Sequence, residues 1–560
     1  MGLCIGAANS TVSLRENARN TVISPRTAIA CASLLLASVS GATALALDSE
    51  PEPPGPATQE MSLREAVATA VAGNPGVLAR AQLPVATRSG ELEALAAWEP
   101  VVKLNLGWDR NHLVPTSALA GAEDGDRVLS EEQASGSLSL SKLLRSGTTL
   151  DLSLAAARRE TNSSFQGLVP EYRPSLGLGL EQPLLRNRRG LQDEITLKLA
   201  RNDTAAERAR FAADLADFVF AIAGAYWDVV LTESRSEAAQ LALELARSLA
   251  ADAEKRVQLG MLAPVAVKEA RAEAASREEQ ALSAANEVRL SLLRLAHMVR
   301  AGDGPRPFEI QPAHGHEPVA SVTDPERSLA LALERRPELR LARLQRENRV
   351  LRVGKARDDR LPSLSLSAGY TLLGAGGRAV PISPFGSDEL VSNPFGGSWS
   401  DAVDLLADGD FNRWSLGLSF ELPLARSASR ARLEKAQARQ LQADHELEDL
   451  ESTVILQLDR ARADLASAWQ RVQAARLAVE LADENLHDQR RRFEEGMVTT
   501  TDVLSFQQKL ADSMAARTLA VTDHALAEAS QQRAQGTLLE HYGVKLEGYE
   551  QQARPWWASF

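Results

Sequence analysis

The sequence predicts an α+β fold that is built twice, from short β-strands and very long α-helices. Two stretches repeat each other, because residues 75–108 can be laid over residues 337–370 at an offset of 262 residues, as from Pro75 to Pro337. Each copy also contains runs in which apolar and polar residues alternate, which is typical of strands with one apolar face. A long run of Ala, Leu, Glu, Arg and Gln follows in each copy, and these residues favour helices. An internal repeat of this length indicates a duplicated domain rather than a solenoid.

The composition limits the classes of protein to which the chain can belong. Its 560 residues carry a net charge of −12, with 44% hydrophobic and 4% aromatic residues. An acidic chain argues against nucleic acid as a partner, because nucleic-acid binding depends on cationic side chains. The length alone would suggest several globular domains, but the duplication favours one elongated pair of halves.

The amino terminus is predicted to be a secretory signal peptide. An apolar run from Thr27 to Leu47 follows several arginines and ends in an A-x-A site, which predicts cleavage after Ala46. The alternatives are an anchoring helix and, because the leader is long, a start codon downstream of Met1. The two cysteines, Cys4 and Cys31, both precede the predicted cut, so the mature chain has no thiol for disulfides or catalysis. Acylation at Cys31 is a further alternative, although this residue stands at the front of the apolar run.

Four alternating runs are predicted to be strands, two in each half. They are Leu104–Trp108 and residues 175–184 in the first half, and residues 363–370 and 414–424 in the second. Apolar residues alternating with polar residues or glycine suit a barrel wall with lipid outside and water inside. Four strands cannot close a barrel alone, and an open edge in lipid leaves backbone groups unpaired. The barrel must therefore be shared between chains.

An insertion between the two strands of the first half leaves the strand count open. Residues 135–156 form an alternating pattern around Arg145-Ser146-Gly147, which predicts a β-hairpin. If the hairpin projects outside the membrane, each chain contributes four strands; if it crosses, each contributes six. Both counts are even, so parity does not decide between them. A short turn between two long loops fits the periplasmic side.

The helical runs are predicted over residues 191–258 and 427–493, and each reaches on the order of 100 Å at about 1.5 Å per residue. After each of these helices a glycine reverses the chain, and a second helix runs back. The return helix is predicted to end at about Val299 in the first half and at about Tyr542 in the second. Apolar spacings of three, four and seven residues predict coiled-coil contact between the helices. Frequent alanine lets neighbouring helices approach on both sides, as a closed ring requires.

The order of these elements resembles that of the TolC-like outer-membrane efflux proteins. The resemblance rests on Asn74-Pro75 and Arg336-Pro337 near the start of each half, and on Pro100 and Pro362 ahead of the first strands. It implies an α+β membrane protein with internal duplication. Three chains then form one outer-membrane β-barrel, with four strands per chain or six with the hairpin. The barrel continues into a long periplasmic α-helical barrel.

The resemblance implies a channel-tunnel of a tripartite efflux or type I secretion system, which passively conducts substrates from an inner-membrane pump to the exterior. The implied partners are a periplasmic adaptor (membrane fusion) protein, an inner-membrane RND or ABC transporter, and outer-membrane lipid. The sequence shows no nucleophile with a base and no ligand cluster, which argues against an enzyme, a metal site and a cofactor. The competing hypothesis is a secreted structural or adhesive coiled-coil envelope protein without transport. The sequence does not identify the cargo.

The helical tips are the predicted functional sites. By resemblance, Gly260, Met261, Gly496 and Met497 contact the adaptor at the periplasmic mouth. Glycine suits the left-handed residue that ends a helix. The resemblance also implies that acidic side chains near the tips narrow the tunnel.

The acids expected to narrow the tunnel are Glu269 and Asp502. Glu269 lies nine residues after Gly260, and Asp502 lies six after Gly496, so the acid has moved between the halves. Three copies of each would focus negative potential, favouring cations and binding divalent ions. The alternative is that both are carboxylates on solvated helix faces.

The chain is predicted to divide into a signal peptide at 1–46, a linker at 47–61, a first repeat at 62–301, a Pro-rich connector at 302–326, a second repeat at 327–542 and a tail at 543–560. His314 and His316 lie in the connector without a third ligand nearby, which favours a solvated linker over a metal site. Gly374-Ala-Gly-Gly377 weakly resembles a phosphate loop, but no helix follows directly, so a flexible loop is expected.

Overall fold

The structure is a computed structural model that describes residues 59–114, 128–261, 263–299, 310–312, 318–319, 324–382, 390–495, 497–498 and 500–546. The predicted signal peptide lies outside the described residues. So do His314 and His316, Gly496, and residues 547–560 of the predicted tail.

The helices of the two halves recur with the same lengths, as the duplication predicts. The short helices of the first half reappear 262 residues later, and the long ones 236 residues later. The short pairs are α1 (Leu63–Gly73) with α5 (Pro325–Arg335) and α2 (Pro75–Ala96) with α6 (Pro337–Asp358). The long pairs are α3 (Leu191–Gln258) with α8 (Ser427–Glu494), of 68 residues each, and α4 (Pro264–Val299) with α9 (Thr500–Gln535), of 36 each.

The helix starts follow from local sequence. Ser62 accepts a hydrogen bond from the N–H of Glu65, whose carboxylate in turn accepts from the N–H of Ser62, so α1 begins with a capping box. Asn74 and Asp324 cap α2 and α5, and both helices then have proline at the first position, where its missing N–H is not needed. The return helix of the second half was predicted to reach Tyr542. It ends instead at Gln535, and after a break at Gly536 the short α10 (Leu538–His541) follows.

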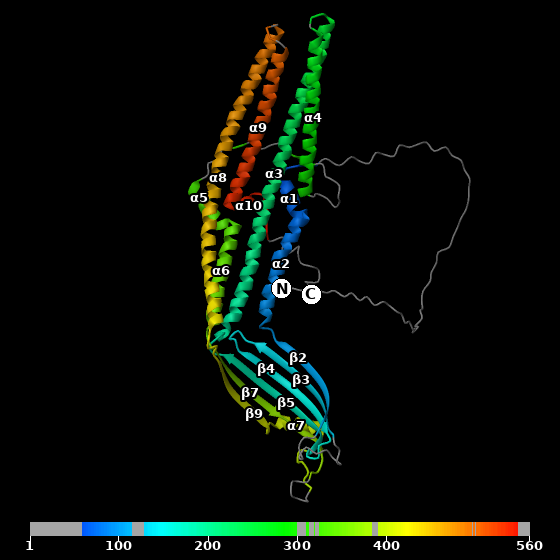
Figure 1. Ribbon diagram of the computed structural model, residues 1–560, viewed down its shortest axis with the longest axis vertical. Coiled ribbons are helices and arrows are strands. Elements are labelled where there is room, and N and C mark those ends of the chain that lie inside the picture. Colours follow the sequence, from blue (N-terminus) through cyan, green and yellow to red (C-terminus); the bar gives the residue numbers. More distant parts are fainter. Residues whose placement is uncertain are drawn as a thin grey trace, which may run out of the picture. The chain divides into compact units, whose positions relative to one another are not determined.

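The helices pack side by side in two hairpins, α3 with α4 and α8 with α9, and α3 also contacts α9 (Figure 1). Matching positions of the two halves lie in the cores: Ala70 and Ala332 are both fully buried, Ile222 is fully buried, and its counterpart Leu458 is nearly so. α3 is the one helix within the described residues that is long and apolar enough to cross a membrane. Its apolar side chains, Ile222 among them, instead pack in the core against α1 and α4.

Six long strands form one antiparallel sheet beyond the ends of the helices (Figure 1). Their order is β2-β3-β4-β5-β7-β9, and the short β8 (Gly376–Ala379) also pairs with β5. The bounds are β2 (Val101–Leu113), β3 (Leu129–Leu143), β4 (Thr149–Thr161), β5 (Leu168–Pro183), β7 (Ser363–Leu373) and β9 (Asn412–Glu421). The predicted hairpin at 135–156 is β3 and β4, and both of its strands lie within the sheet.

Two small features have no counterpart in the sequence prediction. The three-residue strands β1 (Gln59–Met61) and β6 (Ile310–Pro312) pair in parallel and join the starts of the two halves. In the second half, α7 (Trp399–Asp408) lies between β8 and β9 in the chain and packs against β5, β7 and β8. Gly376 and Gly377 begin strand β8, so the flexible loop expected at 374–377 is wrong for these two residues. The stretch leads into a strand and not into a helix, in agreement with the rejection of a phosphate loop.

Candidate functional site

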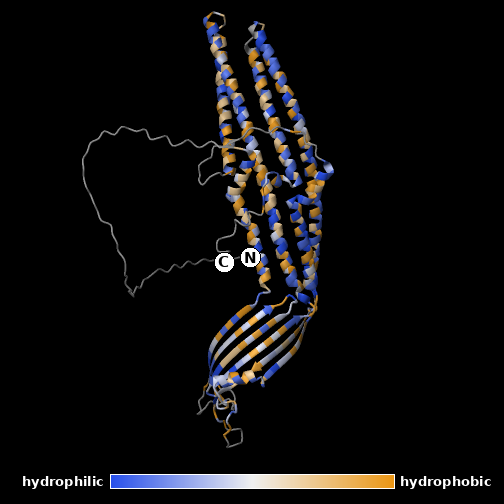
Figure 2. Cartoon of the chain, turned by 180° about the vertical axis from the view of Figure 1, so that it is seen from behind, coloured by the Kyte–Doolittle hydropathy of each residue, from blue (hydrophilic) through white to orange (hydrophobic). Residues whose placement is uncertain are grey.

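One face of the six-stranded sheet is apolar from edge to edge. The strand register places Leu104, Leu138, Leu154, Leu176 and Leu372 in a single row across five strands. Paired residues of antiparallel strands point to the same face, so this row forms one continuous stripe. Figure 2 shows the alternation along each strand as stripes of opposite hydropathy.

Many apolar side chains of this face are exposed rather than packed. Leu106 on β2 is 78% exposed and Trp414 on β9 is 74% exposed. A soluble protein rarely leaves so large an apolar surface in water. An exposed apolar band across all strands, with aromatic residues among its members, is the pattern of a barrel wall facing lipid.

The opposite face of the sheet is polar and carries small side chains. One row across it contains Lys103, Ser139, Ser153, Gly177 and Thr371. Side chains on this face hydrogen bond across strands, as where the Asn105 amide donates to the hydroxyl of Ser137 at 3.2 Å. A face of this composition suits contact with water.

The strand ends that lie away from the helices are polar on both faces. On the polar face, Arg159 of β4 contacts Glu131 of β3 at 2.6 Å, and Arg173 of β5 contacts Glu171 at 2.6 Å. On the apolar face, the indole N–H of Trp108 donates to Glu132 at 3.0 Å. Trp108 therefore marks the level at which the apolar band ends and charged residues begin.

The other end of the sheet meets the helices at the turn of the inserted hairpin. Gly147 in this turn has φ +78°, and its backbone lies against Gly190, the residue before α3. The guanidinium of Arg145 lies 5.3 Å from the ring of Trp98, which follows α2. The short turn is thus on the helical side of the sheet, as the short-turn rule predicted.

The tips of the long helical hairpins end in the same way in both halves. At the first tip, the N–H of Met261 donates to the carbonyl of Arg256 at 2.8 Å, and Gly260, with φ +75°, donates to Val257 at 3.0 Å. This pair of bonds is the Schellman motif, which needs a left-handed residue. At the second tip, the N–H of Met497 donates to the equivalent carbonyl, that of Arg492, at 2.9 Å.

The methionines of both tips project into solvent: Met261 is 70% exposed and Met497 is 65% exposed. Glu269 and Asp502 are also exposed, on the second turn of α4 and the first turn of α9. α3 contacts both α4 and α9, so the two acids belong to helices on opposite sides of α3. A single chain thus places both acids near the tips but on separate helices.

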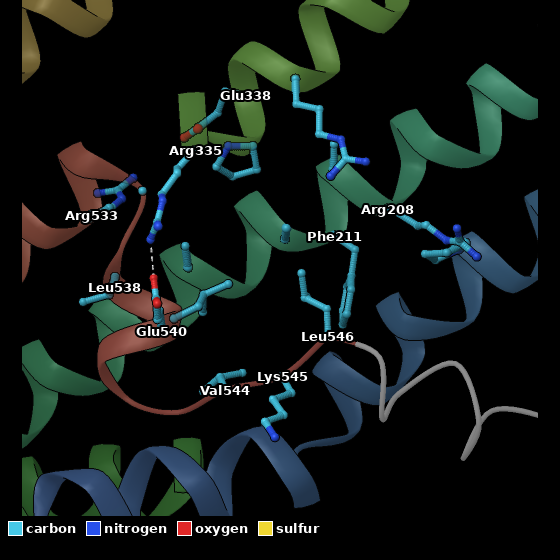
Figure 3. A pocket seen from close by; sticks show the side chains of 18 of the residues that line it. Arg208, Phe211, Arg335, Glu338, Arg533, Leu538, Glu540, Val544, Lys545 and Leu546 are labelled. Atoms are coloured by element: carbon cyan, nitrogen blue, oxygen red, sulfur yellow. Dashed lines mark hydrogen bonds and ion pairs between the residues drawn. The ribbon is translucent and has the colours of Figure 1, made fainter. Parts of the chain in front are cut away.

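A pocket of about 780 Å³ lies between the two halves, among α2, α3, α6, α9 and α10 (Figure 3). Its lining includes several cations, of which Arg335 binds Glu540 and Arg533 binds Asp217 at 2.6 Å. These ion pairs join α5 to α10 and α9 to α3. The pair of Arg533 with Asp217 therefore joins the second repeat to the first beside this pocket.

Residues 329–540, which cover most of the second repeat, match the model of the outer membrane efflux protein family. The second half of this chain is thus similar to outer membrane efflux proteins. No curated protein sequence is a significant match. Solved structures with the same fold include the CmeC outer membrane channel of Campylobacter jejuni, at 15% identity and a TM-score of 0.61, covering 91% of this chain and 94% of that one.

Two further solved structures share the fold of this chain. The outer membrane protein VceC of Vibrio cholerae is 20% identical with a TM-score of 0.57, covering 85% of this chain and 96% of that one. The open-state MtrE outer membrane channel of Neisseria gonorrhoeae is 16% identical with a TM-score of 0.56, covering 85% and 89%. CmeC and MtrE are both described as outer membrane channels.

The resemblance read from the sequence is thus confirmed, together with the barrel-and-tunnel fold. The family match and the structural neighbours support a location in the outer membrane with an extension into the periplasm. Sequence reasoning missed the charged residues at the outer strand ends, including Glu131 and Arg159. The signal was present, because the alternation of β3 fails at Glu131-Glu132-Gln133, where both faces become polar.

Proposed function

We propose that three copies of this chain form one passive efflux channel-tunnel from the periplasm to the exterior. The observation that carries the proposal is the sheet with one apolar face and two open edges. Within the described residues, β2 and β9 each pair with a single strand of the sheet. Unpaired backbone groups in lipid cost several kcal/mol each, so both edges need partners.

Symmetry supplies these partners. β2 runs away from the helices and β9 returns toward them, so β9 of one chain can pair antiparallel with β2 of the next. A closed ring of such contacts leaves no edge exposed. The homotrimer follows from the family resemblance, which implies three chains per barrel.

The helical tips support a role in a tripartite efflux or type I secretion system. Each tip presents an exposed methionine, and methionine suits adaptable contacts with a partner protein. A periplasmic adaptor protein is proposed to bind the tips at Gly260, Met261, Gly496 and Met497. An inner-membrane RND or ABC transporter then supplies the energy, while this chain supplies the duct.

Two measurements on the purified mature protein test the duct. Its particle mass in detergent is expected to correspond to three chains, and planar bilayers that contain it are expected to show ion conductance. A structural or adhesive envelope protein would give no conductance at any concentration. A conducting monomer would contradict the shared barrel.

The adaptor contact has its own test. A photo-reactive amino acid at Met261 or Met497 is expected to cross-link to a periplasmic adaptor in cells that contain the pump. Leu83 on α2 is half exposed and lies far along the sequence from either tip, so it is a matched control position. Cross-linking to the adaptor from Leu83 but from neither tip would refute the proposed docking site.

A further inference from the structure

We infer that the closed barrel has eighteen strands, is about as wide as the helical tunnel below it, and admits solutes that a twelve-stranded barrel excludes. The inference rests on the proposed trimer and adds the size of the exit to it. Its basis is the inserted hairpin of β3 and β4, which raises each chain's contribution from four strands to six.

The inserted strands are full members of the wall. β3 pairs with β2 from Leu129 to Ser141 and with β4 from Glu131 to Leu143, without a register shift. β4 in turn pairs with β5 from Thr149 to Arg159. A hairpin that merely projected from the outer rim would not share so long a register with both neighbours.

The inserted strands also have the same two faces as the rest of the wall. Leu138 and Leu140 of β3, with Leu152 and Leu154 of β4, lie on the apolar face and are 40–49% exposed. Ser137, Ser139 and Ser141 lie between them on the polar face. Each inserted strand thus presents a lipid side and a water side at the same levels as its neighbours.

The added strands set the diameter of the barrel. With strands about 4.8 Å apart and tilted by about 40°, twelve strands give a backbone diameter of about 24 Å, and eighteen give about 36 Å. Four helices lie side by side in each chain, so three chains make a ring of twelve. At about 9 Å between axes, that ring is about 34 Å across. An eighteen-stranded barrel therefore continues the tunnel without narrowing it.

The described residues between β8 and β9, which include helix α7, do not close this exit. Helix α7 packs against the sheet through Trp399, whose ring lies edge-on to that of Tyr172 at 5.8 Å. Tyr172 is four residues before Leu176 on the same strand, so both point to the apolar face. α7 thus lies on the outer side of the wall. The polar face keeps its small side chains, and about 26 Å of open width remains after about 5 Å is taken from each side for side chains.

The first test measures the width of the exit. Neutral polyethylene glycols of graded size are added to either side of a planar bilayer that contains the purified trimer. A polymer about 20 Å across is expected to enter from the extracellular side and lower the conductance, because it fits a lumen of about 26 Å but not one of about 14 Å. Exclusion of this polymer from the extracellular side of a conducting channel would overturn the inference and leave the proposed function intact. Absence of any conductance would overturn both.

The second test asks whether the inserted strands line the pore. The predicted mature chain has no cysteine, so Ser139→Cys and Leu138→Cys each introduce a single thiol. A charged, water-soluble thiol reagent is expected to reduce the conductance of the Ser139 variant in up to three steps, one per chain. The Leu138 variant, one residue away, is expected to be unaffected because it faces lipid. Equal reaction at both positions, or reaction at Leu138 alone, would show that the hairpin is not part of the barrel wall.

Discussion

The close packing of the inserted hairpin's turn against the start of α3 can be tested by replacing Gly147 with alanine. Gly147 has φ +78°, where a β-carbon costs about 1–2 kcal/mol. An added β-carbon would also lie 2.6 Å from the backbone nitrogen and 3.0 Å from the Cα of Gly190. Backbone atoms cannot turn aside as a flexible side chain can, so the turn must move away from the start of α3. Overpacking of this kind costs a further ~1–3 kcal/mol.

Gly260→Ala is the matched control for this experiment. Gly260 has nearly the same φ, +75°, but no atom lies within 4 Å of the position of an added β-carbon. The control therefore contains the backbone penalty of about 1–2 kcal/mol without the contact. The total expected loss is about 2–5 kcal/mol for Gly147→Ala, and the difference between the two variants isolates the contact with Gly190.

The free energy of unfolding of each variant can be measured by guanidinium titration in detergent, followed by tryptophan fluorescence. Trp98 lies next to the guanidinium of Arg145 in the same turn, so its emission reports on the junction. Equal losses in the two variants would refute the close packing of the hairpin turn against α3. The hairpin would then be attached to the sheet alone.

Three further outcomes are expected. Mass spectrometry should find a mature chain that starts near Leu47 without lipid, whereas an acylated Cys31 at the first position would contradict this. Replacing Glu269 and Asp502 with alanine removes six carboxylates from the proposed mouth of the trimer. Single-channel recordings should then show weaker cation selectivity and weaker block by divalent ions, whereas unchanged selectivity would place the constriction elsewhere. The hydrogen bonds from Ser62 lower the pKa of Glu65 below 4.5, so its stabilising effect is present above that pH and is lost as the pH falls through the folded-state value. Glu65→Gln should therefore reduce thermal stability at neutral pH but not in strong acid, and an equal effect at both pH values would contradict the capping role.

Helices α3 and α8 could be predicted from the sequence almost to the residue. The predicted range 191–258 is the range of α3, and the predicted end of α8 at Phe493 differs from the structure by one residue. Strong helix formers fill both runs, and a glycine follows each. The strands could be predicted equally well where small polar residues alternate with leucine, as in β7.

The parts that the sequence did not predict depend on contacts rather than on local pattern. β1 and β6 have three residues each, too few for a period of two to be visible. α7 is short and lies within a glycine-rich stretch, although Ser398 and Asp401 form a capping box that could have indicated its start. Whether β3 and β4 cross the membrane depended on pairing across the sheet, because four and six strands both return the chain to the periplasm. The grouping of Glu269 with Asp502 depends on neighbouring chains and stays a prediction.

The even number of strands in each chain has a consequence for how such exits can change in evolution. A chain can gain or lose wall only by whole hairpins, since a single strand would leave its long helices on the wrong side of the membrane. In a trimer every such change occurs three times around the ring. The number of strands in the barrel therefore changes in steps of six, and its diameter in steps of about 12 Å. Here one step lies between residues 129 and 161, while the helices of the two halves keep identical lengths. The diameter of the barrel can thus change in evolution while the long helices below it stay the same.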